Sequence, residues 1–349
     1  MKSLRMILLL LLIPAPASIA LSPSDCFKKN SLKEGRITCG EVEYWISKPA
    51  RCKGSCGLIV DLHGRWMSPK SMRATTRLDR LGTQNGFWVV HPLGPQKAWT
   101  VFHQVQRTGL ETAATTGTRG SANKMKMKKK KKVPKPPEVV DTAATFERYR
   151  RVAADLLALR QKEKITGPTM VTGYSQGALM TWYLGCRYRQ ELSIRSIAPL
   201  SYSVNDRFCS AADLAKGLNI FYAEGKCDLG DEHGGGRSTA LTLSGAGSLR
   251  MPLHFSAKHK ASACDGRRFA FTRQLRKDGS TLLFLDHEFL VTNQRYRPFL
   301  GSHCMPQQAT DKYPNIGCEN SPLDWGSMVM AFFLNPTGPV PGETPSRSH

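Results

Sequence analysis

The chain has no long apolar run that would cross a membrane. Its one apolar stretch near the start, residues 6–13, is too short to span a bilayer. Two basic residues precede this stretch, and small residues follow it at 18–20. This pattern is typical of a secretory signal peptide, with an uncleaved signal anchor as the alternative. We therefore expect residues 1–20 to be removed, the mature protein to be extracellular, and no transmembrane segment to be present.

The sequence also lacks the spacings of a zinc site, because it has no Cys-x-x-Cys pair and no histidine pair beside its cysteines. We expect no metal and no organic cofactor. All ten cysteines lie after residue 20, and an even count in a secreted chain favours disulfides. Proximity suggests the pairs Cys52–Cys56 and Cys304–Cys318, and the other pairings stay open.

Acidic residues are scarce, since 27 Asp and Glu face 50 Lys and Arg, for a net charge of +23. The signal peptide and the segment from Lys124 to Lys135, which holds eight lysines and no acid, carry part of this charge. The rest of the chain is basic but not extreme, which favours acidic surroundings such as cell-wall polymers. We expect no specific nucleic-acid partner, and only weak binding to acidic surfaces through Lys124 to Lys135.

Residues 106–137 contain no aromatic residue and are rich in Thr, Gly, Lys and then Pro, which predicts a disordered surface insertion. Around this insertion, strand and helix patterns alternate. Strands are expected at 41–47, 58–62, 87–90, 170–172, 193–200, 218–223 and 282–285, and helices at 68–86, 141–163 and 322–334. The alternation predicts an α/β fold with a mostly parallel central sheet flanked by helices. We expect a cysteine-containing segment at 21–57, one domain at 58–336, and a disordered tail at 337–349.

Residues 173–177 read Gly-Tyr-Ser-Gln-Gly and fit the pattern of a nucleophile elbow. In such an elbow a serine occupies a strained turn between a buried strand and a helix, and small residues on either side let the two elements pass closely. The flanking residues agree, because 170–172 favour a strand and 178–184 favour a helix. Ser175 is therefore the candidate nucleophile. The alternative is an ordinary glycine-rich turn.

An elbow serine needs a base and an acid that orients this base. In the α/β-hydrolase order, the acid and then the histidine follow the serine along the chain. The loop after the expected strand at 218–223 should carry the acid. Asp228 lies in that loop and is our candidate, with Glu224, Asp231 and Glu232 as close competitors.

The candidate base is His303, which lies in a constrained turn before the last expected helix. His287, directly after an apolar strand, is the alternative. The histidines at 63, 91 and 103 precede Ser175 and break the expected chain order, and the remaining ones lie in the acid's own loop, in a basic stretch or at the chain end.

An oxyanion hole is expected where the strand at 58–62 ends in His63 and Gly64. In this fold one backbone donor follows the nucleophile and the other comes from an early strand's loop. The two donors are then the N–H groups of Arg65 and Gln176. The Arg65 side chain can also attract an anionic group of a substrate, and His63 is expected to be structural there.

Four short motifs together resemble the secreted polyhydroxybutyrate depolymerase and feruloyl-esterase-like branch of the α/β hydrolases. They are Asp-Leu-His-Gly at 61–64, the elbow, Gly-Lys-Cys-Asp at 225–228, and Gly-Ser-His-Cys-Met-Pro at 301–306, with Phe-Phe at 332–333 after them. The resemblance covers 57–335, with 106–137 as an interruption. It implies Ser175 as nucleophile, Asp228 as acid and His303 as base, and it supports Arg65 and Gln176 as oxyanion donors.

Two departures from that branch lie beside the expected reaction centre. Its elbow usually reads Ser-Ala-Gly-Gly, where this chain has Ser-Gln-Gly-Ala at 175–178, and its Leu-His-Gly turn is often followed by Cys, where this chain has Arg65. The elbow is also similar to that of cutinases, which lack the Leu-His-Gly turn.

The sequence therefore predicts a secreted serine esterase that hydrolyses carboxylic esters of the polyester or feruloyl- and acyl-polysaccharide type, including polymeric ones. The alternatives are a cutinase-like esterase and a non-catalytic protein of hydrolase fold that binds acidic polymers.

Overall fold

The computed structural model describes residues 21–29, 35–52, 55–104, 138–202, 209, 217–228, 264–294, 297–308 and 316–343. The expected signal peptide and the insertion at 106–137, with the segment from Lys124 to Lys135, lie outside these residues. Within the described ranges, no helix has both the length and the apolar character that a membrane crossing requires.

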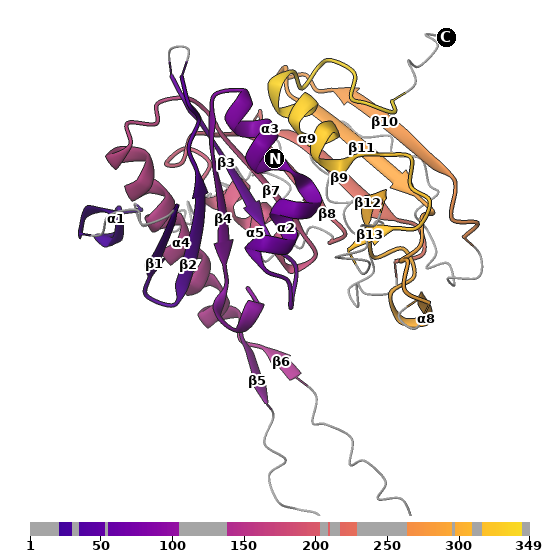
Figure 1. The fold of residues 1–349 in the computed structure, drawn as a ribbon, viewed down its shortest axis with the longest axis horizontal. Helices are drawn as coiled ribbons and strands as arrows, with labels where there is room; N and C mark the ends of the chain where they lie inside the picture. Colours follow the sequence, from indigo (N-terminus) through magenta and orange to yellow (C-terminus); the bar gives the residue numbers. More distant parts are fainter. Residues whose placement is uncertain are drawn as a thin grey trace, which may run out of the picture.

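A sheet of nine strands runs through the centre of the molecule (Figure 1). Its spatial order is β1-β2-β4-β3-β7-β8-β9-β11-β10. The strands are β1 (Arg36–Cys39), β2 (Val42–Ser47), β3 (Gly57–Leu62), β4 (Phe87–Leu93), β7 (Thr169–Tyr174), β8 (Ile194–Leu200), β9 (Asn219–Gly225), β10 (Phe269–Leu275) and β11 (Thr281–His287). The six strands from β4 to β11 in this order run parallel, whereas β2 and β10 are antiparallel to their inner neighbours. This is the predicted α/β-hydrolase fold with its mostly parallel sheet.

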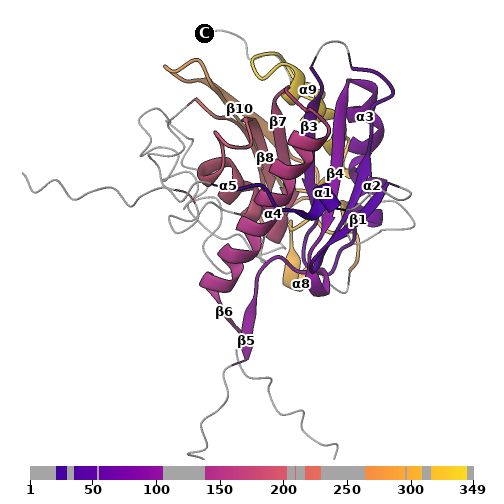
Figure 2. The same cartoon turned by 90° about the vertical axis from the view of Figure 1, so that its left-hand side faces the viewer.

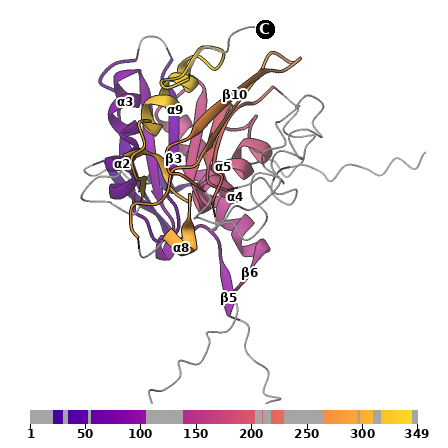
Figure 3. The ribbon, with the colours of Figure 1, turned by 90° about the vertical axis from the view of Figure 1, so that its right-hand side faces the viewer.

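Helices cover both faces of the sheet, as Figures 2 and 3 show from opposite sides. On one face lie α1 (Cys26–Lys29), α4 (Thr142–Lys162) and α5 (Gln176–Arg187), and on the other lie α2 (Pro69–Thr76), α3 (Leu78–Gln84) and α9 (Trp325–Leu334). Each face has its own cluster of buried apolar side chains. The inner strands β3, β7 and β9 are buried along their whole length, as expected of parallel strands covered on both faces.

The single helix expected at 68–86 is wrong, because the chain forms α2 and α3 with a break at Arg77. Arg77 takes a left-handed conformation, with φ of 56°, and its side chain pairs with Asp324 at the start of α9. The carbonyl of Thr76 packs so closely on Gly326 that a Cβ there would lie 1.7 Å from its oxygen. The break therefore lets the α2–α3 junction fit against α9.

The predicted helix ends at the capping residues are otherwise close to the observed ones. Ser68 caps α2 with Pro69 as its first residue, and Asp141 caps α4 by accepting the N–H of Ala144 at 3.0 Å. The last helix begins at Trp325 rather than at 322, because the Asp324 side chain accepts from Ser327 and caps it there.

Several short elements connect the larger ones. The strands β5 (Phe102–Gln104) and β6 (Glu138–Val140) pair antiparallel at the two ends of the insertion, and Figure 1 shows them projecting from the body. A 3-10 turn, η1 (Pro95–Lys97), follows β4, and α8 (Arg297–Leu300), β12 (Met305–Gln308) and β13 (Gly317–Cys318) lie before α9. Within the tail expected to be disordered, residues 337–343 are described, and Glu343 pairs with Arg273 of β10.

All ten cysteines are described, and all form disulfides. The pairs are Cys26–Cys39, Cys52–Cys56, Cys186–Cys209, Cys227–Cys264 and Cys304–Cys318. The two pairs suggested by proximity are therefore confirmed, while the other three join cysteines 13 to 37 residues apart.

Candidate active site

Ser175 lies at the turn between β7 and α5, in a strained conformation with φ of 54° and ψ of −120°. The turn is tight because strand and helix pass each other without intervening side chains. A Cβ on Gly173 would lie 2.4 Å from the carbonyl oxygen of Gly177, and a Cβ on Gly177 would lie 2.3 Å from that of Leu62. Both glycines of the motif are thus required by backbone contact, and an outlier of this kind is typical of a nucleophile elbow.

Three side chains from distant parts of the sequence form one hydrogen-bonded chain at Ser175. The Oγ of Ser175 lies 3.0 Å from Nε2 of His303, and Nδ1 of His303 lies 2.8 Å from Oδ2 of Asp228. They follow β7, β9 and β11, whose carboxyl ends meet at one edge of the sheet. This is the geometry of a nucleophile, a base and an orienting acid.

Asp228 and His303 are held together by their own loops. The N–H of Ser302 donates to the carbonyl of Cys227 at 3.0 Å, and Asp228 forms a β-bridge with Gly301. Gly225 permits this contact, since a Cβ there would lie 2.2 Å from the Cβ of Ser302.

A disulfide also adjoins each of these two side chains. Cys227, directly before Asp228, is bonded to Cys264. Cys304, directly after His303, is bonded to Cys318. The positions of the acid and the base are therefore fixed by covalent cross-links in addition to hydrogen bonds.

Tyr174 is a further member of the site that the sequence motif alone did not identify. Its hydroxyl donates to the carbonyl oxygen of His303 at 2.7 Å, and the two rings lie 5.2 Å apart. Burial and the charge of Asp228 raise the pKa of Tyr174 well above its ordinary value, so the phenol stays a neutral donor. Tyr174 thus connects the elbow directly to the base. Its place beside the serine in the motif was the only available signal.

The two expected oxyanion donors flank the elbow. Gln176 is the first residue of α5, where backbone N–H groups have no intrahelical partner. Its side chain is turned away to accept the N–H of Trp99 at 3.1 Å. Arg65 follows Gly64, and a Cβ on Gly64 would lie 2.9 Å from the Tyr174 ring. The turn that carries Arg65 is therefore packed against the elbow, as an oxyanion hole requires.

His63 has the partners of a structural residue. Its Nδ1–H donates to the Gly64 carbonyl at 2.7 Å, and its Nε2 accepts the N–H of Gly94 at 3.0 Å. Its ring packs on Trp99, whose indole N–H donates to the His63 carbonyl at 2.8 Å. Burial lowers the pKa of His63 to about 4, so the ring is neutral and joins the loops after β3 and β4.

The competing residues lie elsewhere or outside the described residues. His287 ends β11 fully buried beside Phe289, and within the described ranges neither ring nitrogen has a hydrogen-bond partner. Burial lowers its pKa to about 3. Glu224 accepts a hydrogen bond from the Tyr222 hydroxyl within β9. Asp231 and Glu232 are not among the described residues.

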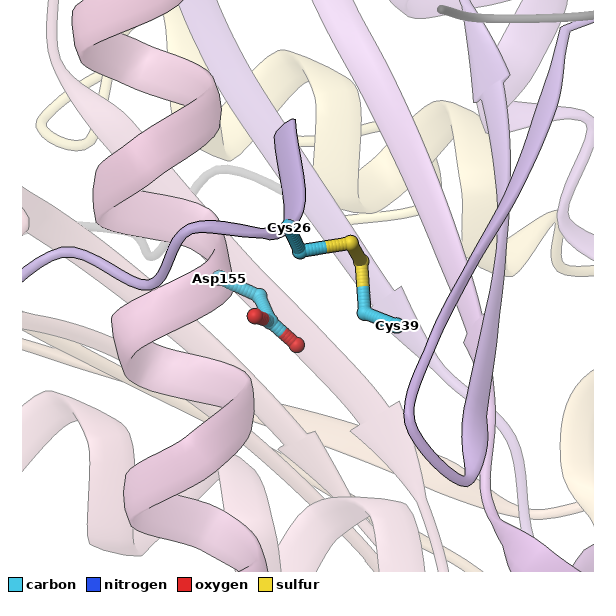
Figure 4. Close-up of side chains that lie close together, drawn as sticks. All are labelled: Cys26, Cys39 and Asp155. Atoms are coloured by element: carbon cyan, nitrogen blue, oxygen red, sulfur yellow. A yellow bond between two sulfur atoms is a disulfide. The ribbon is translucent and has the colours of Figure 1, made fainter. Parts of the chain in front are cut away.

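Among the described residues, one group of potential metal ligands gathers, made of Cys26, Cys39 and Asp155 (Figure 4). The two sulfurs are bonded to each other, so neither is a thiolate that could bind a metal. The Asp155 carboxylate instead accepts from the hydroxyls of Tyr44 at 2.7 Å and Ser24 at 2.5 Å. The cluster therefore fastens the N-terminal segment to α4.

No family model matches the chain, and no curated protein matches it. Among solved structures, it is similar to an acetyl xylan esterase from Aspergillus awamori, with 16% identity and a TM-score of 0.47 over 74% of this chain and 93% of that one. A thermostable esterase has 13% identity and a TM-score of 0.41 over 76% and 57%. Est1E from Butyrivibrio proteoclasticus has 10% identity and a TM-score of 0.34 over 59% and 83%. Values this low say nothing of substrate.

Proposed function

We propose that the protein is a secreted serine esterase that cleaves carboxylic esters through an acyl-enzyme. The observation that supports this best is the hydrogen-bonded chain from Ser175 through His303 to Asp228, with contacts of 3.0 and 2.8 Å. The elbow gives further support, because Ser175 lies at a strand-to-helix turn with φ of 54° and ψ of −120°, a conformation that costs free energy.

The reaction follows from the positions of the side chains. His303 Nε2 accepts the proton of Ser175 as Oγ attacks the ester carbonyl, and the N–H groups of Arg65 and Gln176 stabilise the oxyanion. The tetrahedral intermediate collapses, the C–O bond breaks, and the alcohol leaves with the proton from His303. Water then attacks the acyl-enzyme with His303 again as base. Asp228 holds Nδ1–H and stabilises the imidazolium in both steps.

Substitution of the nucleophile tests this proposal directly. We expect Ser175→Ala to lower kcat for p-nitrophenyl acetate by roughly four to six orders of magnitude and to abolish labelling by a fluorophosphonate. The matched control is Ser201→Ala. Ser201 also follows a parallel strand in a left-handed conformation, with φ of 55°, and is buried. This variant should keep both activity and labelling.

Labelling at Ser175 that disappears in His303→Ala would sustain both assignments. Folded protein that is never labelled and turns over no ester would overturn the proposal. It would favour instead a non-catalytic protein that is retained on acidic polymers in a salt-sensitive manner.

Extracellular location is part of the proposal. Five disulfides that use every cysteine support it, because such bonds persist in oxidising compartments. The resemblance to polyhydroxybutyrate depolymerases and feruloyl esterases suggests a polymeric ester. The cutinase-like alternative ranks second, because cutinases lack the Leu-His-Gly turn that this chain has at 62–64.

A further inference from the structure

Trp66 is the most exposed large apolar side chain among the described residues, with 74% of its surface accessible. It also takes a left-handed conformation, with φ of 65°, which bulky residues rarely adopt. An exposed indole gains nothing from burial, and a strained backbone costs free energy. The two observations together indicate that this indole contacts something outside the chain.

The backbone at Trp66 is held by two loops at the edge of the sheet. The backbone N–H of Trp66 donates to the carbonyl of Lys97 at 2.7 Å, and the backbone N–H of Met67 donates to the carbonyl of Gly64 at 3.1 Å. The Lys97 loop is fixed in turn, because the carbonyls of Ala98 and Trp99 accept from Arg148, each at 3.3 Å. Trp66 is therefore presented on a rigid support.

This support is next to the proposed reaction centre. Trp66 directly follows Arg65, the proposed oxyanion donor, and the turn before it packs on the ring of Tyr174. Tyr174 adjoins Ser175 in the chain and hydrogen-bonds to the backbone of His303. Trp66 and Ser175 are thus carried by turns that pack on the same tyrosine.

One cation lies against the indole, and a second is on the loop that binds the Trp66 backbone. The guanidinium of Arg65 lies 4.6 Å from the centre of the Trp66 ring. Lys97 is exposed, and its charge is one of the causes that lower the pKa of His63 beneath these loops. An indole face binds the flat face of a ring, while adjacent cations attract a negative group on that ring.

We propose that Trp66 and Lys97 form a binding platform for an acidic sugar, so that the preferred substrates are acyl esters carried on uronic-acid polysaccharides. This inference rests on the proposed esterase function and specifies its substrate class. A neutral polysaccharide accounts for the indole but not for the cations on these loops. The chain that remains after residues 1–20 is also basic, which steers it toward the same class of polyanion.

The test compares acetate release from acetylated polygalacturonate with release from the same polymer after its carboxylates are methyl-esterified. The backbone and the acetyl groups are identical, and neutral methyl esters replace the charged carboxylates. Acetate is therefore quantified separately from methanol, so that cleavage of the methyl esters does not enter the rate. We expect kcat/KM to be about tenfold higher on the charged polymer at low ionic strength, and the ratio to approach one in 1 M salt, where the Debye length is about 3 Å.

Two pairs of variants locate the effect. Trp66→Asn removes the indole, and asparagine tolerates the left-handed backbone, so we expect KM for the charged polymer to rise about tenfold. Trp66→Tyr keeps an aromatic ring and should retain most of the affinity. Lys97→Asn should remove part of the charge preference, roughly threefold at low salt, and Lys97→Arg should keep it. The polymer rates of each variant are divided by its own rate on p-nitrophenyl acetate, so that a general loss of activity is separated from a loss of polymer binding.

Equal rates on the two polymers, or an unchanged KM in Trp66→Asn, would overturn the inference about the acidic sugar. Turnover of p-nitrophenyl acetate in the same experiment would leave the esterase proposal standing. A loss in Trp66→Asn that is confined to aromatic acyl esters would likewise overturn it, in favour of an acyl-group contact. Absence of turnover on every ester, with no effect of Ser175→Ala, would instead remove the esterase proposal itself.

Discussion

Two regions of the site, the nucleophile region around Ser175 and the acid–base region around Asp228 and His303, hold their side chains in position by different means. Around Ser175, residues close in sequence are fixed by backbone packing at the centre of the sheet, where Gly177 touches the carbonyl of Leu62. Around Asp228 and His303, loops from distant parts of the chain are joined by a β-bridge and flanked by disulfides. A short motif can encode the first arrangement, whereas the second depends on the whole fold.

The largest expected loss of stability follows from adding a Cβ to a glycine that packs against the backbone. Both regions contain such a glycine, Gly177 and Gly225. In Gly177→Ala the new Cβ would lie 2.3 Å from a backbone oxygen of β3, which cannot move without disturbing the sheet. We expect a loss of about 4–5 kcal/mol in unfolding free energy, measured by chemical denaturation, together with loss of activity. Gly185→Ala is the comparison, because its Cβ would meet the Ile197 side chain at 2.9 Å rather than a backbone oxygen, and we expect a smaller loss with activity retained.

Gly225→Ala separates the two regions. Its Cβ would displace Ser302 and thereby move His303 relative to Asp228. We expect a folded protein with a smaller stability loss of about 1–3 kcal/mol but a strongly reduced kcat. If Gly225→Ala lowers the unfolding free energy as much as Gly177→Ala does, the acid–base region is as essential to folding as the centre of the sheet. The proposed difference between the two regions would then be wrong.

The next effect concerns disulfides. The disulfide Cys227–Cys264 joins residues 37 positions apart, and Cys26–Cys39 joins residues 13 positions apart. The chain-entropy estimate gives losses of about 4 and about 3 kcal/mol when each pair is replaced by serines. Activity of the protein that remains folded should fall only in the variant lacking Cys227–Cys264, because this bond adjoins Asp228. Equal specific activity in the two double variants, measured at matched folded fractions, would contradict this role.

The smallest effect is a dependence of stability on pH. Burial lowers the pKa of His287 to about 3 from an ordinary value of 6.5, so the unfolded chain binds the extra proton first as pH falls. The stability from neutral His287 is complete above pH 6.5 and decreases as pH falls toward 3, so only a small part of it is lost between pH 7 and pH 6. His287→Phe should flatten this part of the profile and cost little at pH 7.

His63, which lies beside the nucleophile region, provides a second pH-dependent contribution to stability that can be compared with that of His287. Its pKa is lowered to about 4, so its contribution also declines below pH 6.5. Unlike the ring of His287, the ring of His63 accepts a hydrogen bond from the N–H of Gly94 and donates one to the carbonyl of Gly64. His63→Phe should therefore destabilise the protein at every pH and lower kcat, because the loop with Arg65 loses its support. A denaturation series from pH 5 to 8 on both variants distinguishes the two cases.

Much of the fold could be predicted from local patterns. The buried strands β3, β7 and β9 are short apolar runs, and the capping residues Ser68 and Asp141 mark helix starts that the structure confirms. The break at Arg77 could not be predicted, because it arises from the packing of α2 and α3 on α9. The edge strand β10 was missed for a related reason, since its residues are only partly buried and pair with β11 alone.

The sequence by itself indicated the elbow, since small residues on both sides of a serine let a strand and a helix pass at backbone contact. It also predicted Asp228 and His303 in the α/β-hydrolase chain order, but Asp231 and His287 remained open. Only the tertiary structure brought Nδ1 of His303 within 2.8 Å of Asp228 and left His287 buried beside Phe289. The physical reason is that distances between loops are set by the parallel register of β7, β9 and β11 and by cross-links such as Cys227–Cys264, which local residue patterns do not contain.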